Sequence, residues 1–141
     1  MVKAAAIISA LISMTSFAYD GVLLSKTTNS GYGMPSTSSN CEIYANKVVL
    51  THSSLGVQVV NTKNISLTGD LKRVMSFASR GPFETQIAPV DGPTATYYAT
   101  LANGDMLQRI DLLIDAGNGV KRINKSEASF GLRSLIDKNC S

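Results

Sequence analysis

Hydrophobic and polar residues alternate most regularly between Thr94 and Asp115, on both sides of the dipeptide Asn103-Gly104. Asn-Gly favours a two-residue type I′ turn, because both central residues of that turn need positive φ. Counting outward from the turn places Leu101 opposite Met106 and gives one mostly apolar face and one mostly polar face. The stretch is therefore predicted to be a β-hairpin with one face in the core.

The same register assigns two neighbouring tyrosines to opposite faces. Tyr97 lies opposite Ile110 on the apolar face. Tyr98 lies opposite Arg109 on the polar face. A slip by one residue would exchange the two faces, so the pattern specifies the register. Tyr98 and Arg109 are therefore expected on the solvent side of the sheet, where they are candidate binding residues.

A second hairpin is indicated by two stretches rich in β-branched residues. Glu42 to Thr51 and Val57 to Val60 are its predicted strands, and Ser53 to Gly56 has the composition of a turn. Val48, Val49 and Leu50 are consecutive, so the alternation is interrupted there. Such an interruption is typical of a bulge or of burial on both faces.

Two stretches carry apolar residues at helical spacing. The first begins after a cap at Thr68 or Asp70 and stops before Gly81-Pro82. The second begins at about Asn124 or Ser126 and occupies the remaining residues. The element order β-β-α-β-β-α predicts an α+β fold, in which an antiparallel sheet of two hairpins carries both helices on one face.

The chain opens with an uncharged apolar run from Ala4 to Ala18, and small residues occupy positions 16 and 18. This pattern is typical of a secretory signal peptide, so residues 1–18 are predicted to be removed by cleavage between Ala18 and Tyr19. The run is shorter than a bilayer-spanning helix, so no permanent membrane anchor is expected. The predicted location is secreted or periplasmic.

After the cleavage site we expect two parts. Residues 19–40 are predicted to form a short strand followed by a loop rich in Ser, Thr and Gly. Residues 41–141 are predicted to form a single α+β domain, because a chain of this length supports one core.

Two predicted loops offer further candidate binding residues. Tyr32 and Met34 are the only large apolar side chains in the first loop. Phe83 and Pro89 lie in the second, residues 81–93, which three prolines stiffen. A rigid loop loses little entropy on binding, as inhibitor loops do. The alternative is that both loops only connect their neighbouring elements.

Cys41 and Cys140 are the only two cysteines. In an exported protein such a pair is predicted to form a disulfide. A metal centre would need further ligands, and His52 is the single histidine, so no metal site is predicted.

No arrangement of residues indicates catalysis or a cofactor. His52 has no Gly-x-Ser-x-Gly partner motif, and Asp111 and Asp115 would lie roughly 13 Å apart on one strand, too far to act as a carboxylate pair. The net charge is +3 and no basic run exceeds two residues, so nucleic acid is not an expected partner. Asn64 and Asn124 match the glycosylation acceptor pattern, which matters only in a eukaryotic secretory pathway.

The sequence thus predicts an exported, non-catalytic domain that acts by surface binding. It would serve as an inhibitor or interaction module for an extracellular or periplasmic protein. The alternative is a secreted hydrolase whose site is assembled from residues distant in sequence. The sequence does not define an oligomeric state.

Overall fold

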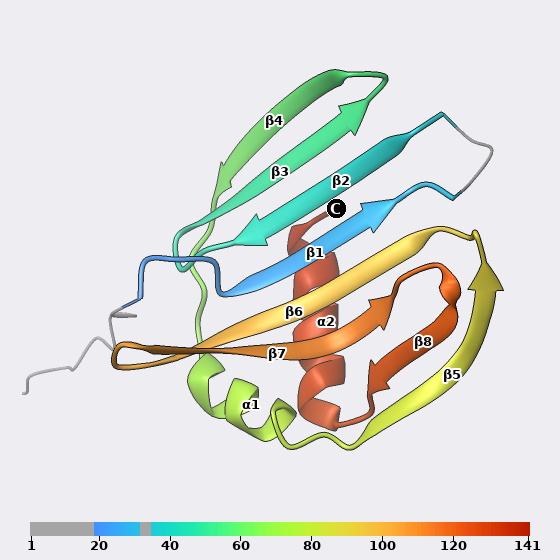
Figure 1. The fold of residues 1–141 in the computed structure, drawn as a ribbon. Helices are drawn as coiled ribbons and strands as arrows, with labels where there is room; N and C mark the ends of the chain where they lie inside the picture. The colour runs from blue at the N-terminus through green and yellow to red at the C-terminus, as the bar shows by residue number, and fades with distance from the viewer. Residues whose placement is uncertain (1–18, 32–34) are drawn as a thin grey trace, which may run out of the picture.

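The computed structural model describes residues 19–31 and 35–141, which form one antiparallel sheet of eight strands with two helices against one of its faces (Figure 1). The order across the sheet is β4-β3-β2-β1-β6-β7-β8-β5. The elements are β1 (Leu24–Asn29), β2 (Thr37–Ile43), β3 (Lys47–Ser54), β4 (Val57–Asn64), α1 (Leu71–Ala78), β5 (Phe83–Val90), β6 (Thr94–Asn103), β7 (Met106–Asp115), β8 (Asn118–Asn124) and α2 (Glu127–Asn139).

This arrangement corrects the predicted fold. The chain combines a sheet with two helices as expected, but the order β-β-α-β-β-α and the sheet of two hairpins are wrong. Four strands precede each helix, and the two blocks of four meet where β1 pairs with β6. The first four strands therefore make one half of the sheet and the last four make the other half.

Two of the additional strands come from the predicted Ser- and Thr-rich loop. Most of β1 and β2 lies between residues 25 and 40, where Thr27 pairs with Asn40 and donates a hydrogen bond to its side chain at 2.9 Å. In an antiparallel sheet with one solvent-exposed face, only every second residue of a strand needs to be apolar. Leu24, Cys41 and Ile43 supply enough buried apolar surface, and polar side chains, most of them hydroxyls, occupy the other positions.

The predicted stiff loop at residues 81–93 contains another strand, β5, which pairs with β8 at the edge of the sheet. Proline is tolerated in an edge strand because one side of such a strand needs no ladder hydrogen bonds. The register shifts between Ile87 and Val90, around Pro89. Pro89 therefore interrupts the pairing of this edge strand but does not prevent the strand from forming.

The central hairpin forms between β6 and β7, but its register differs from the predicted one by two residues. Leu101 pairs with Gln108, and the turn residues are Gly104 and Asp105. Of these two only Gly104 has positive φ, at 58°, as in a type II′ turn. A shift of two residues keeps every side chain on its predicted face, so the division into two faces survives the wrong register.

A bulge then changes the pairing of the two tyrosines. Tyr98 pairs with Asp111 and Tyr97 pairs with Leu113, which leaves Leu112 as an extra residue in β7. The predicted partners Arg109 and Ile110 pair with residues nearer the turn. Leu112 is fully buried, so the bulge allows an additional side chain of β7 to enter the core.

The type I′ turn occurs in the hairpin of β3 and β4 instead. Leu55 and Gly56 are its central residues, with φ of 49° and 77°. Leu55 is one of two non-glycine residues in the described ranges with positive φ. The hairpin predicted at this place is thus present, although its first strand begins at Lys47 and not at Glu42.

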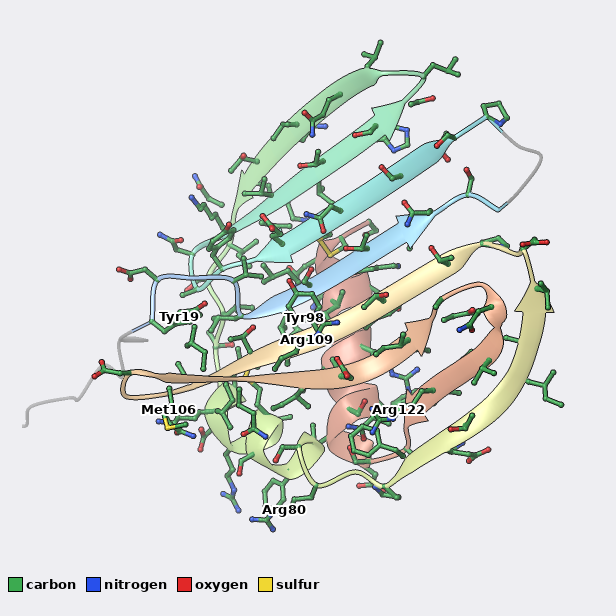
Figure 2. The ribbon with its side chains drawn as sticks, in the orientation of Figure 1. Tyr19, Arg80, Tyr98, Met106, Arg109 and Arg122 are labelled. Atoms are coloured by element: carbon green, nitrogen blue, oxygen red, sulfur yellow. A yellow bond between two sulfur atoms is a disulfide. The ribbon has the colours of Figure 1, made fainter. Side chains whose placement is uncertain are left out.

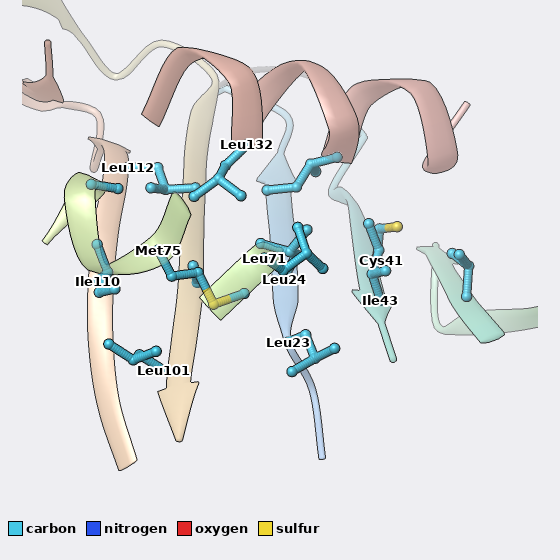
Figure 3. Packing of buried hydrophobic residues seen from close by; sticks show 14 residues of the cluster. Leu23, Leu24, Cys41, Ile43, Leu71, Met75, Leu101, Ile110, Leu112 and Leu132 are labelled. Carbon is cyan, nitrogen blue, oxygen red and sulfur yellow. The ribbon is translucent and has the colours of Figure 1, made fainter. Parts of the chain in front are cut away.

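Both helices begin at residues that the sequence offered as caps. Asp70 accepts a hydrogen bond from the backbone N–H of Arg73 at 3.2 Å, and Ser126 accepts one from Ser129 at 3.0 Å. Each cap satisfies one of the N–H groups that a helix end leaves unpaired. The helices bury Leu71, Met75 and Ala78 of α1 and Ser129, Leu132 and Ile136 of α2 against the sheet (Figure 3).

The last turn of α2 is fixed across the seam between the two halves of the sheet. The predicted disulfide is confirmed: Cys140, just after α2, is bonded to Cys41 of β2, with Cα atoms 5.9 Å apart. Beside it, Asp137 Oδ1 accepts hydrogen bonds from Lys26 Nζ at 2.7 Å and from the Tyr97 hydroxyl at 2.8 Å. The helix end is therefore held by residues of β1, β2 and β6 together.

We predict that Cys140→Ser lowers the melting temperature strongly, because the bridge closes a loop between residues 99 apart in sequence. The chain-entropy account gives about 4 to 5 kcal/mol for such a loop, and real bridges often give less. Thermal melts of Cys140→Ser, Cys41→Ser and the double variant provide the measurement. All three variants should show the same decrease in melting temperature, and reductant should cause the same decrease in the parent protein. A double variant much less stable than either single variant would show that the thiols act separately.

The Asp137 carboxylate makes a pH-dependent contribution to stability. Burial alone would raise the pKa of Asp137, but hydrogen bonds from Lys26 and Tyr97 outweigh burial and hold the pKa below its ordinary value. A carboxyl group with a lowered pKa stabilises the fold above its unfolded pKa, near 3.8, and loses this effect as pH falls through the folded pKa.

We therefore predict that Asp137→Asn destabilises the protein at pH 7, by about 1 kcal/mol or less because the pair is partly exposed. The difference from the parent should shrink as the pH falls below about 4, where the parent carboxyl group also becomes neutral. Urea unfolding at pH 7 and pH 3 measures both values. Asp105→Asn is the control, because Asp105 lies in an exposed turn and forms no ion pair with a described residue. If Asp137→Asn lowered the free energy of unfolding equally at both pH values, the charge of Asp137 would not be the source of the stabilisation.

Candidate functional site

The helices pack on one face of the sheet, and the described residues leave the middle of the other face uncovered (Figure 1). We call this the open face. Strand alternation and the observed pairing assign to it mainly hydroxyl and amide side chains. These are Thr27 and Asn29 of β1, Ser38 and Asn40 of β2, and Thr94, Thr96 and Thr100 of β6.

Tyr98 and Arg109 meet on the open face, as the sequence predicts (Figure 2). The guanidinium carbon of Arg109 lies 4.4 Å from the centre of the Tyr98 ring. Arg109 Nε also donates a hydrogen bond to Asp111 Oδ1 at 2.9 Å. Stacking and hydrogen bonding together fix the orientation of the guanidinium group before any partner arrives.

Asp111 connects this pair to a second arginine. Its other carboxylate oxygen lies 3.9 Å from Arg122 Nη1, and the Arg122 guanidinium lies 4.2 Å from the centre of the Phe83 ring. A continuous row of contacts thus runs across β6, β7, β8 and β5. We call it the Tyr98–Phe83 cluster; its members are Tyr98, Arg109, Asp111, Arg122 and Phe83.

The cluster remains accessible to a partner. The side chains of Arg109 and Arg122 are 56% and 49% exposed, and Phe83 is 40% exposed. Among the described residues, Asp111 is the only hydrogen-bond partner of the Arg109 side chain, so most of its N–H donors are open to solvent. Two guanidinium groups share one carboxylate, which leaves the cluster with an excess of positive charge.

A second aromatic group lies further along the open face, after β2. The Tyr44 hydroxyl donates to Glu42 Oε2 at 3.2 Å, and Lys47 Nζ lies 4.9 Å from the centre of the Tyr44 ring. Burial, and then the charge and hydrogen bond of Glu42, raise the pKa of Tyr44. Ser25 lies between Glu42 and Tyr98 in the strand pairing and is almost fully buried.

The structure brings together three of the six predicted binding residues, namely Tyr98, Arg109 and Phe83. Pro89 lies further along β5, in the region of its register shift, and makes no described contact with the cluster. Tyr32 and Met34 lie outside the described residues, as does the predicted signal peptide, residues 1–18.

Sequence reasoning missed Asp111 and Arg122 as parts of the cluster. The predicted register pairs Asp111 with Thr96, and the two-residue shift at the turn moves it opposite Tyr98. Arg122 reaches the open face because it pairs with Ile114, which pairs with Thr96. The bulge at Leu112 brings Ile114 to that face, and no alternation pattern in the sequence indicates it.

A histidine–serine contact lies between β2 and β3. His52 Nδ1 lies 2.9 Å from Ser39 Oγ, but this pair is a cross-strand contact, and within residues 19–31 and 35–141 no carboxylate bonds the other ring nitrogen. The same ranges contain no group of three or more His, Cys, Asp or Glu side chains arranged to bind a metal ion. Neither described helix is long and apolar enough to cross a bilayer.

In comparisons with known proteins, no family model, no curated protein and no solved structure matches this chain.

We predict that Tyr97→Ala destabilises the protein several times more than Tyr98→Ala. Tyr98 contributes mainly its stacking with Arg109, about 0.5 to 1 kcal/mol at an accessible position. Tyr97 packs against the core and bonds Asp137, and truncating a buried aromatic residue costs about 3 kcal/mol or more. Thermal melts of the two variants provide the comparison. Equal losses would show that the two tyrosines do not lie on opposite faces.

Proposed function

We propose that this chain is an exported domain that binds a partner protein through the open face of its sheet. Export is supported by the predicted signal peptide and by the disulfide, since such bonds persist in oxidising compartments. The partner is then an extracellular or periplasmic protein. This chain would act by binding that partner, without catalysing a reaction.

The observation that carries this proposal is the Tyr98–Phe83 cluster. Tyrosine and arginine are enriched among the residues that contribute most to protein–protein binding energy. In this cluster each arginine is already stacked on an aromatic ring and paired with Asp111, so little side-chain entropy remains to be lost on binding. The surrounding Thr, Ser and Asn side chains would supply the polar rim that protein interfaces have.

The chemistry of the cluster also defines the kind of partner surface that fits it. Arg109 and Arg122 share one carboxylate and keep further N–H donors free. A partner carboxylate could receive two parallel hydrogen bonds from either guanidinium, which is the strongest pairing available to these groups. We therefore expect the partner to present Asp or Glu beside an apolar or aromatic contact for Phe83 and Tyr98.

The proposal predicts that Arg109→Ala weakens partner binding by at least about 30-fold, as for an interface hot spot, while changing stability by 1 kcal/mol or less. The experiment captures partners from the protein's own compartment on the immobilised mature domain and measures the affinity of each captured protein. Lys121→Ala is the matched control, because Lys121 adjoins Arg122 in β8 but points to the other face. A partner that binds the parent, Arg109→Ala and Lys121→Ala equally well would contradict a role for the open face.

A further inference from the structure

A second surface, on the helical side of the molecule, has a different chemistry. We propose that a shallow hollow beside α1 binds a small ligand that carries clustered phosphate groups. The hollow has a volume of about 490 Å³ and lies between the outward side of α1 and the end of β6. The residues used here are Lys72, Arg73, Ser76, Phe77 and Arg80 from α1 and the chain just after it, with Asn103 from β6.

The cations of the hollow are arranged around one exposed aromatic ring. Arg73 and Phe77 are four residues apart and lie on one side of α1, and Arg80, just after the helix, reaches the same ring. The guanidinium carbons of Arg73 and Arg80 lie 5.7 and 5.5 Å from the centre of the Phe77 ring, which is 48% exposed. Phe77 thus holds both arginines at the wall of the hollow.

The positive charge of the hollow is not neutralised by the described part of the protein. Lys72, Arg73 and Arg80 form no ion pair with any described residue, whereas Lys26, Arg109, Arg122 and Lys125 each do. One carboxylate, Asp70, also lines the hollow, and its Oδ1 accepts the backbone N–H of Arg73. Three cations against one carboxylate leave a net charge of +2 in the hollow.

These charges do not help α1 to form. Lys72 and Arg73 lie in its first turn, which contains no acidic residue, and cations are unfavourable at that end of a helix. Neighbouring like charges on a helix also repel each other. Stacking on Phe77 is the one stabilising contact described here for Arg73 and Arg80, so a ligand better explains why three cations gather at this place, as local exceptions to stable design often have a functional reason.

Phosphate matches the groups that line the hollow. A guanidinium group binds phosphate oxygens through two parallel N–H donors, and a lysine adds a point charge. Ser76 and Asn103 can donate further hydrogen bonds from a hydroxyl and an amide. The volume is within the range of small-molecule sites, and two or more phosphate groups would balance the net charge. A soluble phosphorylated molecule and a phosphorylated lipid headgroup share this chemistry.

The test titrates the disulfide-bonded mature protein with tripolyphosphate and with inositol hexakisphosphate, by calorimetry and by NMR of the backbone amides. We expect saturable, salt-sensitive binding with shifts centred on α1 and Asn103. The Arg73→Gln/Arg80→Gln variant should bind at least about tenfold more weakly, because it loses two charged donors. Lys63→Gln, at an exposed cation of β4, should bind like the parent.

A single variant controls for misfolding of the double variant, and lipid vesicles distinguish a soluble ligand from a lipid headgroup. Arg80→Gln alone lies beyond the last helical residue, so it should fold normally and still bind more weakly. Vesicles containing a phosphorylated inositol lipid, compared with phosphatidylcholine vesicles, distinguish a headgroup from a soluble ligand. Either source supports the proposal if the α1 variants reduce binding. It is overturned by absence of binding to both probes and vesicles, by equal binding of the variants, or by tighter binding of duplex DNA than of the small probes.

Discussion

The position of α2 across the seam of the sheet is the constraint on which the rest of the structure depends. The first four strands and the last four strands are separate blocks in sequence, and they pair directly at one place, between β1 and β6. The C-terminal helix lies over that seam and is bonded to β2 through Cys41, while Asp137 connects it to Lys26 and Tyr97. With the seam fixed, the uncovered side of β1, β2, β6 and β7 is a defined surface.

The two surfaces that we assign to binding use the same local device. Each phenylalanine in the described ranges lies within about 6 Å of a guanidinium group, and Tyr98 does as well. An aromatic ring gives a long, flexible arginine a fixed place at the surface. On the open face Asp111 partly neutralises the arginines, whereas the three cations beside α1 face a single capping carboxylate. Because of this difference in charge balance, the open face suits a protein surface, and the hollow beside α1 suits a strongly anionic ligand.

The sequence was most informative where one local pattern decides the outcome. The caps Asp70 and Ser126, the faces of Tyr97 and Tyr98, and the two hairpins at their approximate places all follow from short-range chemistry. The disulfide could be predicted because the chain has only two cysteines. It was least informative where long-range pairing decides. Thr27 and its hydroxyl neighbours form strands only because Leu24 and Ile43 bury the other face. Asp111 lies opposite Tyr98 only because the register is shifted by two residues at the turn. Arg122 reaches the candidate site only because the bulge at Leu112 brings its partner Ile114 to the open face, which no alternation pattern indicates.

The two-block architecture has a consequence for resistance to proteolysis. The connection between the blocks, from residue 65 to residue 70, is mostly exposed and leads from the edge strand β4 to α1. Exposed connections of this kind are preferred sites of cleavage. Cys41 lies before that connection and Cys140 after it. A cut there would therefore convert the chain into two fragments that stay joined by one covalent bond and by the β1–β6 pairing, with the open face still assembled across both.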